Sequence, residues 1–257
     1  MISVIKIKLA ALRENAGAAH VGPLLVFMLL SLFPGWIRVE DAGSPWFLRY
    51  PEHAWYPLQT LTCGGLLWWW RRQYSLPPCS LPTLLLATGL AAIGIVCWVL
   101  PGWLYQHWTG LGAVDQRWWR WLGVVGRTEG FTPAVFTGDQ VAQILTLFFR
   151  FLRSCLVVAF VEELCWRGWL MRAVLAEDKP FTSVPFGTHS WKAYGITTLA
   201  VTLIHQPEDW VAAFIWGSLV YLLAIKTRSL RACIAMHAVG NLMLGLYIVR
   251  TGQYGYW

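Results

Sequence analysis

Residues 82–104 read PTLLLATGLAAIGIVCWVLPGWL, a run of the chain that contains no charged side chain. A helix needs about 20 consecutive apolar residues to cross the hydrocarbon core of a bilayer, because each residue adds about 1.5 Å to its length. This run therefore predicts a transmembrane helix.

Comparable apolar windows recur along the chain, separated by charges, Pro and Gly. They predict further spans at about 21–37, 54–70, 152–172, 193–206, 209–226 and 231–249. We therefore expect an all-α fold, a polytopic transmembrane helix bundle of about seven spans, or eight if the long helical stretch 140–175 is broken. Residues 1–257 should form a single integral membrane domain. The Trp- and Gly-rich connection 105–139 should lie at the membrane interface and hold a short amphipathic helix.

Composition supports a membrane protein. The chain is 57% hydrophobic and 13% charged, whereas an ordinary soluble domain is roughly 25% charged. The net charge of +7 is spread over short loops, which indicates topology control and contact with lipid head groups and argues against nucleic acid as a partner. The six cysteines form no CxxC pair and fall mostly within apolar runs, so we expect buried free thiols.

The stretch VEELCWRGWL, residues 161–170, places three charges in such an apolar segment. Charges are costly in hydrocarbon, and those that occur there usually mark function. Glu163 and Arg167 are four apart, so they share a helix face and can pair. Glu162 is rotated by about 100° from Glu163 and has no evident local partner, which suits it to holding and moving a proton. The alternative is one structural cluster of both glutamates with the arginine.

Two later spans carry the remaining polar groups. His205 ends the stretch ITTLAVTLIH, and His237 and Asn241 lie four apart in IAMHAVGNLM, residues 234–243, so they point the same way. Each group alone could be a core histidine or an interhelical hydrogen bond. Because each cluster lies roughly midway along its predicted span, one buried site could collect them all.

Together these residues have the chemistry for hydrolysis of a peptide bond. A glutamate can activate water as a general base, and a histidine can orient that water and carry its proton. A second histidine and an asparagine can donate hydrogen bonds to a developing oxyanion. No Ser–His–Asp order, HExxH motif or Gly-rich phosphate loop competes with this interpretation.

With these motifs the chain resembles the CAAX-protease and bacteriocin-processing family of intramembrane proteases, also called Abi proteins. Glu162, Glu163 and Arg167 meet its EExxxR motif, and His237 and Asn241 meet HxxxN. Its FxxxH motif is met in part, because His205 is present but Val201 stands at the Phe position. The resemblance covers about residues 140–250, the motif-bearing catalytic part.

The resemblance implies roles for these residues. Glu162 and His205 would activate water, His237 and Asn241 would stabilise the oxyanion, and Glu163 and Arg167 would brace the first helix. It implies a membrane-associated protein or peptide substrate and a multi-pass protein of the bacterial inner (plasma) membrane.

We expect no cofactor. Zinc held by Glu162, His205 and His237 is the main alternative to this metal-free mechanism. The tail LYIVRTGQYGYW is also similar to a bacterial subgroup associated with exosortase systems, which process C-terminal sorting tags. A transporter and a non-catalytic immunity or scaffold protein stay open as other functions, and the oligomeric state stays open as well.

Overall fold

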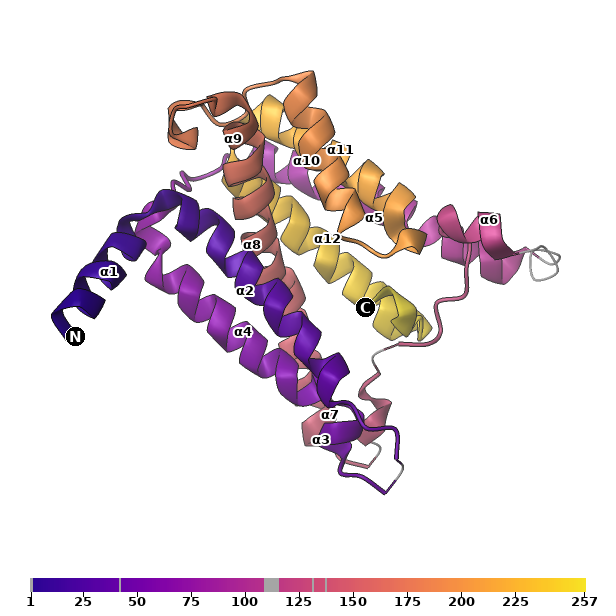
Figure 1. Ribbon diagram of the computed structural model, residues 1–257. Coiled ribbons are helices and arrows are strands. Elements are labelled where there is room, and N and C mark those ends of the chain that lie inside the picture. Colours follow the sequence, from indigo (N-terminus) through magenta and orange to yellow (C-terminus); the bar gives the residue numbers. More distant parts are fainter. Residues whose placement is uncertain (1, 42, 109–115, 131, 137) are drawn as a thin grey trace. The chain divides into compact units, whose positions relative to one another are not determined.

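The computed structural model describes residues 2–41, 43–108, 116–130, 132–136 and 138–257 (Figure 1). Every regular element in this described part is a helix, which confirms the predicted all-α fold. The residues group by their mutual contacts into two compact units. The first unit contains Met1–Leu76 and Pro133–Cys165, and the second contains Pro77–Thr132 and Trp166–Trp257.

The first unit begins with α1 (Ile2–Glu14) and α2 (Ala16–Ile37), continues with α3 (Trp46–Arg49), α4 (Glu52–Trp69) and η1 (Arg71–Gln73), and returns at residue 133. The Asn15 side chain accepts a hydrogen bond from the Ala18 amide at 2.9 Å, and this cap starts α2 five residues before the predicted span.

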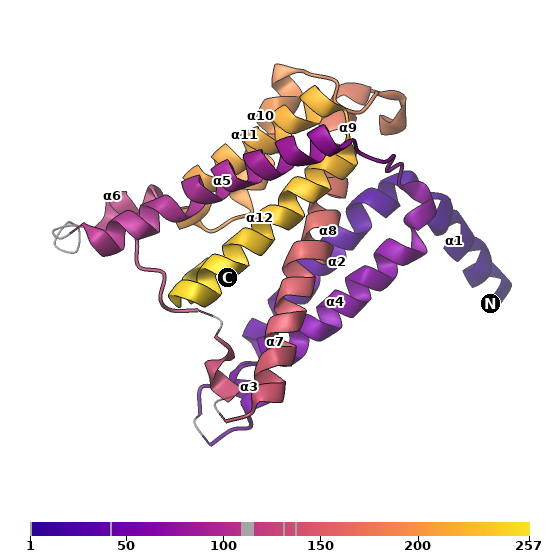
Figure 2. The ribbon, with the colours of Figure 1, turned by 180° about the vertical axis from the view of Figure 1, so that it is seen from behind.

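Helices α2 and α4 lie side by side (Figures 1 and 2), joined by polar side chains that reach the neighbouring backbone. Gln59 of α4 donates to the Phe27 carbonyl of α2 at 2.8 Å, and Trp55 donates to the Leu30 carbonyl at 2.6 Å. A carbonyl that is already bonded within its helix can accept a second hydrogen bond, so these contacts join the pair without breaking either helix.

One long apolar helical stretch, Gln140–Ala176, carries the first motif. It is assembled from α7 (Gln140–Leu152), the π-helical η4 (Arg153–Val158), α8 (Ala159–Glu163), the π-helical η5 (Leu164–Leu170) and α9 (Met171–Ala176). Short π-helical turns inside α-helices occur often at functional sites. In the first unit Arg153 donates to the Gln59 side chain at 2.7 Å, so η4 is tied to α4.

The second unit contains α5 (Leu81–His107), α6 (Gln116–Trp121), α10 (Trp191–Leu203), α11 (Trp210–Thr227), α12 (Leu230–Thr251) and the short turns η6 (Phe181–Ser183), η7 (Pro207–Asp209) and η8 (Tyr254–Tyr256). Helix α5 packs along α12 and against α11 (Figures 1 and 2).

The Trp216 indole is the centre of this packing. A Cβ on Gly94 of α5 would lie 2.6 Å from that indole, and one on Gly240 of α12 would also collide with it. Both helices therefore approach α11 through a residue without a side chain, and the ring fills the space between them.

Within the part of the chain that the structure describes, five helices are long and apolar enough to cross a membrane: Ala16–Ile37, Leu81–His107, Gln140–Ala176, Pro207–Thr227 and Leu230–Thr251. The other two predicted spans, 54–70 and 193–206, are helical as α4 and α10, but α10 has only 13 residues. The predicted count of seven to eight spans is therefore not confirmed. In the connection 105–139, α6 is a short helix with three tryptophans, and residues 109–115 lie outside the described part.

Candidate active site

The two carboxylates of the first motif differ in solvent exposure. Glu163 is fully buried and Arg167 is 1% exposed, whereas the neighbouring Glu162 is partly exposed. Adjacent residues on a helix point about 100° apart, so one carboxylate can be enclosed while the other remains accessible. Arg167 donates to the Gly217 carbonyl of α11 at 3.3 Å, which anchors its guanidinium within the second unit.

His205 lies just beyond the end of α10, and its ring orientation is fixed by a backbone contact. Its Nδ1 is 2.7 Å from the Val201 carbonyl oxygen. A carbonyl can only accept, so Nδ1 carries the proton and Nε2 carries the lone pair. This is the tautomer that a base needs if Nε2 is to receive a proton from water.

The surroundings of His205 include the position at which the family motif has Phe. Val201 is 1% exposed and belongs to the buried face of α10. An aromatic ring nevertheless lies beside the histidine, because the Trp98 ring of α5 meets the His205 ring edge-on at 5.4 Å between centroids. The Trp210 indole N–H donates to the His205 carbonyl at 3.0 Å and holds the backbone of the turn.

His237 and Asn241 lie on α12, in regular α-helix, so the spacing of four residues places them on one face. His237 is 6% exposed, and its ring meets Trp216 edge-on at 5.6 Å between centroids. Asn241 is partly exposed and follows Gly240, the glycine against which the Trp216 indole packs. Trp216 thus packs against both the histidine and the backbone beside the asparagine.

The predicted site residues divide between the two units. Glu162 and Glu163 belong to the first unit, and Arg167, His205, His237 and Asn241 belong to the second. That these side chains share one cavity therefore stays a prediction, and so does the ion pair of Glu163 with Arg167.

Residues 144–243 match the family model of the Rce1-like type II CAAX prenyl endopeptidases. The match confirms the family resemblance drawn from the motifs, and all six motif residues lie inside it. It implies a protease and suggests CAAX-type intramembrane activity on a membrane-associated protein. No curated protein and no solved structure matches the chain.

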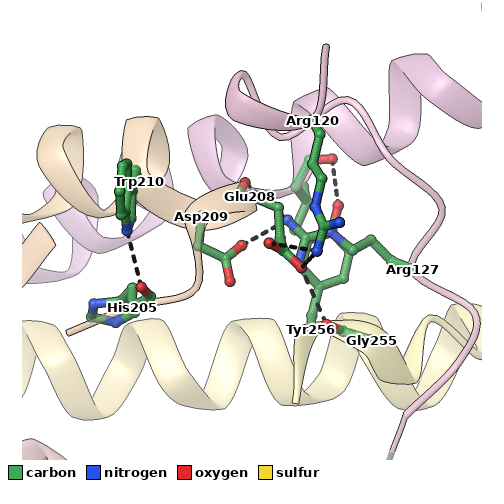
Figure 3. A network of polar contacts seen from close by, with 9 residues as sticks. Arg120, Arg127, His205, Glu208, Asp209, Trp210, Gly255 and Tyr256 are labelled. Carbon is green, nitrogen blue, oxygen red and sulfur yellow. Dashed lines mark hydrogen bonds and ion pairs between the residues drawn. The ribbon is translucent and has the colours of Figure 1, made fainter. Parts of the chain in front are cut away.

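A charged network beside His205 was not among the predicted site residues (Figure 3). Arg127, 5% exposed, donates to the Asp209 carboxylate at 2.7 Å and to the Glu208 carbonyl at 3.1 Å. Part of the signal was present in the sequence, since Glu208 and Asp209 lie three and four residues after His205, but their basic partner lies about eighty positions earlier. Proximity of that kind is set by tertiary structure alone.

The zinc alternative requires three ligands close together. Within the described ranges, no group of three His, Cys, Asp or Glu side chains is arranged to hold a metal ion. The zinc alternative would draw Glu162 from one unit and the two histidines from the other, so it has to be decided by experiment.

Proposed function

We propose that this chain is an intramembrane endopeptidase that hydrolyses a peptide bond of a membrane-associated protein with water activated by Glu162 and His205. The Rce1-like match supports the protease class. The observation that most supports this mechanism is the His205 ring, whose Nδ1–H is bonded to the Val201 carbonyl so that Nε2 is the basic nitrogen.

In this mechanism the partly exposed Glu162 is the general base. The oxygen of the water attacks the peptide carbonyl while a proton passes to the glutamate or to His205. His237 and Asn241 donate hydrogen bonds to the carbonyl oxygen as it gains negative charge. The proton then moves to the leaving amine as the C–N bond breaks, so that one water is consumed and no other reagent is needed.

Burial distinguishes the two glutamates in the proposal. Glu163 is fully buried and cannot meet a water molecule or a substrate without a large rearrangement. We assign to it and to Arg167 the bracing of the helix. Glu162 has the exposure that a general base requires.

We propose that the reaction needs no metal. The polar pair of α12 is histidine with asparagine, and a neutral amide is a poor zinc ligand but a good donor to an oxyanion. Zinc would bind water and lower its pKa, and in that case Glu162, His205 and His237 would be its ligands.

We propose as substrate the C-terminal segment of a membrane-associated protein. The matched family is described as CAAX prenyl endopeptidases. A role in processing C-terminal sorting tags is the narrower form of this proposal, and it is motivated by the tail of the chain, residues 246–257.

The test uses the purified full chain in proteoliposomes. A farnesylated peptide that ends in Cys-aliphatic-aliphatic-X and its unprenylated twin are supplied, and release of the C-terminal tripeptide is followed by mass spectrometry. Glu162→Gln should abolish release with an unchanged melting temperature, because the amide keeps the shape but cannot take the proton. Glu177→Gln, at an exposed carboxylate just beyond α9, is the matched control and should cleave normally.

Membranes that contain the wild-type chain or Glu162→Ala should then be compared by terminal proteomics, which identifies natural substrates by their altered C-termini. Equal termini in both membranes, together with no cleavage of either peptide, would contradict the proposed function.

A further inference from the structure

We propose that Arg127 and Asp209 form a positioning pair for His205, braced by η8, so that two segments outside the Rce1-like match complete the site. This inference rests on the proposed function, because it takes His205 as the group that carries the proton. All of the residues concerned belong to the second unit.

The first step concerns the turn that presents His205. Only one residue separates the histidine from η7, whose last residue is Asp209. The next residue, Trp210, donates its indole N–H to the His205 carbonyl at 3.0 Å, and the Asp209 carboxylate accepts a hydrogen bond from Arg127 at 2.7 Å. Figure 3 shows Asp209 between the side chains of His205 and Arg127. The carboxylate therefore has one neighbour at the proposed site and another in a distant part of the chain.

The second step concerns Arg127, which fixes that carboxylate. Its Nη2 donates both to the Asp209 carboxylate at 2.7 Å and to the Glu208 carbonyl at 3.1 Å. One guanidinium group thus holds a side chain and the backbone of η7 together. A charge-assisted bond of this length in a buried place is stronger than one in water.

The third step is what holds Arg127 itself. The Tyr256 ring lies 4.7 Å from the guanidinium carbon, and the Gly255 amide donates to the Arg127 carbonyl at 2.8 Å. Tyr256 in turn donates its hydroxyl to the Val99 carbonyl of α5 at 3.2 Å. Burial raises the pKa of the Tyr256 hydroxyl to about 12, so it remains a donor at physiological pH. Residues 254–256 therefore link α5, Arg127 and η7.

A second ion pair on the same turn, between Arg120 and Glu208, is more exposed than the pair of Arg127 with Asp209. Arg120 meets the Glu208 carboxylate at 3.5 Å with its side chain 61% exposed, whereas the Arg127 side chain is 5% exposed. Exposed pairs contribute little, because water and salt screen them. Two arginines thus act on adjacent residues of one turn, and only Arg127 can hold it rigidly.

The pair matters for catalysis because the proton transfer depends on direction. Nε2 has to point toward the water to receive its proton. Because Nδ1 is bonded to the Val201 carbonyl, the direction of Nε2 is set by the backbone conformation around His205. Arg127 keeps the Asp209 carboxylate and the η7 backbone in one arrangement, and so fixes the turn from which the histidine is presented. The charged side chains around the histidine in this network are Asp209, Glu208, Arg127 and Arg120.

The experiment uses the full chain in proteoliposomes and the farnesylated peptide as probe. Arg127→Gln and Asp209→Asn should each lower kcat by about 10- to 100-fold, because a catalytic group displaced by about 1 Å can cost roughly 10²-fold in rate, with KM within about twofold of wild type. Arg120→Gln is the matched control, because Arg120 of α6 pairs with Glu208 of the same turn through an exposed side chain, and it should leave kcat unchanged. Arg127→Lys should recover part of the lost kcat, since lysine keeps the positive charge but lacks the several N–H donors of the guanidinium group.

The double variant Arg127→Gln with Asp209→Asn should be no slower than the slower single variant, because both act as one unit. Melting temperatures are measured for every variant. A folded Asp209→Asn protein with wild-type kcat overturns the inference, and so does a loss confined to KM. Loss of folding in both single variants also overturns it, because the pair would then be structural. By contrast, wild-type cleavage by His205→Ala would refute the proposed function itself.

Discussion

Glu162 and Glu163 are neighbours in the chain, yet only the second is enclosed. The difference follows from helix geometry, which turns adjacent side chains about 100° apart. Two glutamates on the same helical turn can therefore have different roles, Glu163 in stability and Glu162 in catalysis. The two should respond differently to substitution.

Arg167 offers a test at this scale. Its guanidinium is 1% exposed and donates to the Gly217 carbonyl, so Arg167→Ala removes a buried donor. If Glu163 pairs with it, a buried carboxylate is also left without compensation, which typically costs about 3–5 kcal/mol. At about 2–4 °C per kcal/mol for a protein of this size, the melting temperature should fall by roughly 10 °C.

Thermal unfolding followed by size-exclusion chromatography in detergent measures this shift. Arg250→Ala, at an exposed position near the end of α12, is the control and should melt like wild type. A normal melting temperature combined with lost cleavage would instead indicate that Arg167 acts on the substrate.

At the scale of elements, Trp216 determines how closely three helices approach. Gly94 has no room for a methyl group, since a Cβ would lie 2.6 Å from the indole. Gly89, on the same helix, has nothing within 4 Å of that position. The two glycines therefore form a matched pair, one required for packing and the other open to substitution.

Gly94→Ala should destabilise the chain by about 1–3 kcal/mol, the usual cost of overpacking. Gly89→Ala should be neutral or slightly stabilising, because Ala favours helix more than Gly does. Melting temperatures compare the two variants. Replacing Trp216 with Phe in the Gly94→Ala chain should restore part of the stability, and equal stability of the two alanine variants would show that the indole moves aside freely.

Local sequence pattern was sufficient for some elements and insufficient for others. The apolar runs predicted the helices α2, α5, α11 and α12, because spanning length is a local property. Helix α2 begins five residues before the predicted span, because the Asn15 cap is a local signal that an apolar window does not detect.

The candidate site divides in the same way. The residue types and spacings of Glu162, His205, His237 and Asn241 were readable because each motif is contained in a few consecutive residues. The contact of Arg127 with Asp209 was not readable, because it joins segments about eighty residues apart. This contact can be identified only from the three-dimensional structure of the second unit.

At the scale of the whole molecule, the metal-free mechanism makes a clear prediction. Purified protein in proteoliposomes should keep full cleavage activity in excess chelator, and elemental analysis should find no stoichiometric metal. Because structural and catalytic zinc sites bind tightly, the incubation must be long and the chelator strong. Zinc at one equivalent, with activity lost on chelation and restored by zinc, would overturn the mechanism while leaving the fold unaffected.

The shortness of α10 has a consequence for the lipid around the second unit. Its 13 residues span about 20 Å, whereas the hydrocarbon core of a bilayer is about 30 Å thick. If α10 enters the bilayer, the lipids next to it accommodate the mismatch by local thinning. The turn that carries His205 then lies in the thinned region, and water has a shorter distance to travel to the histidine. Bilayer thickness then becomes a control on the supply of the second substrate, water.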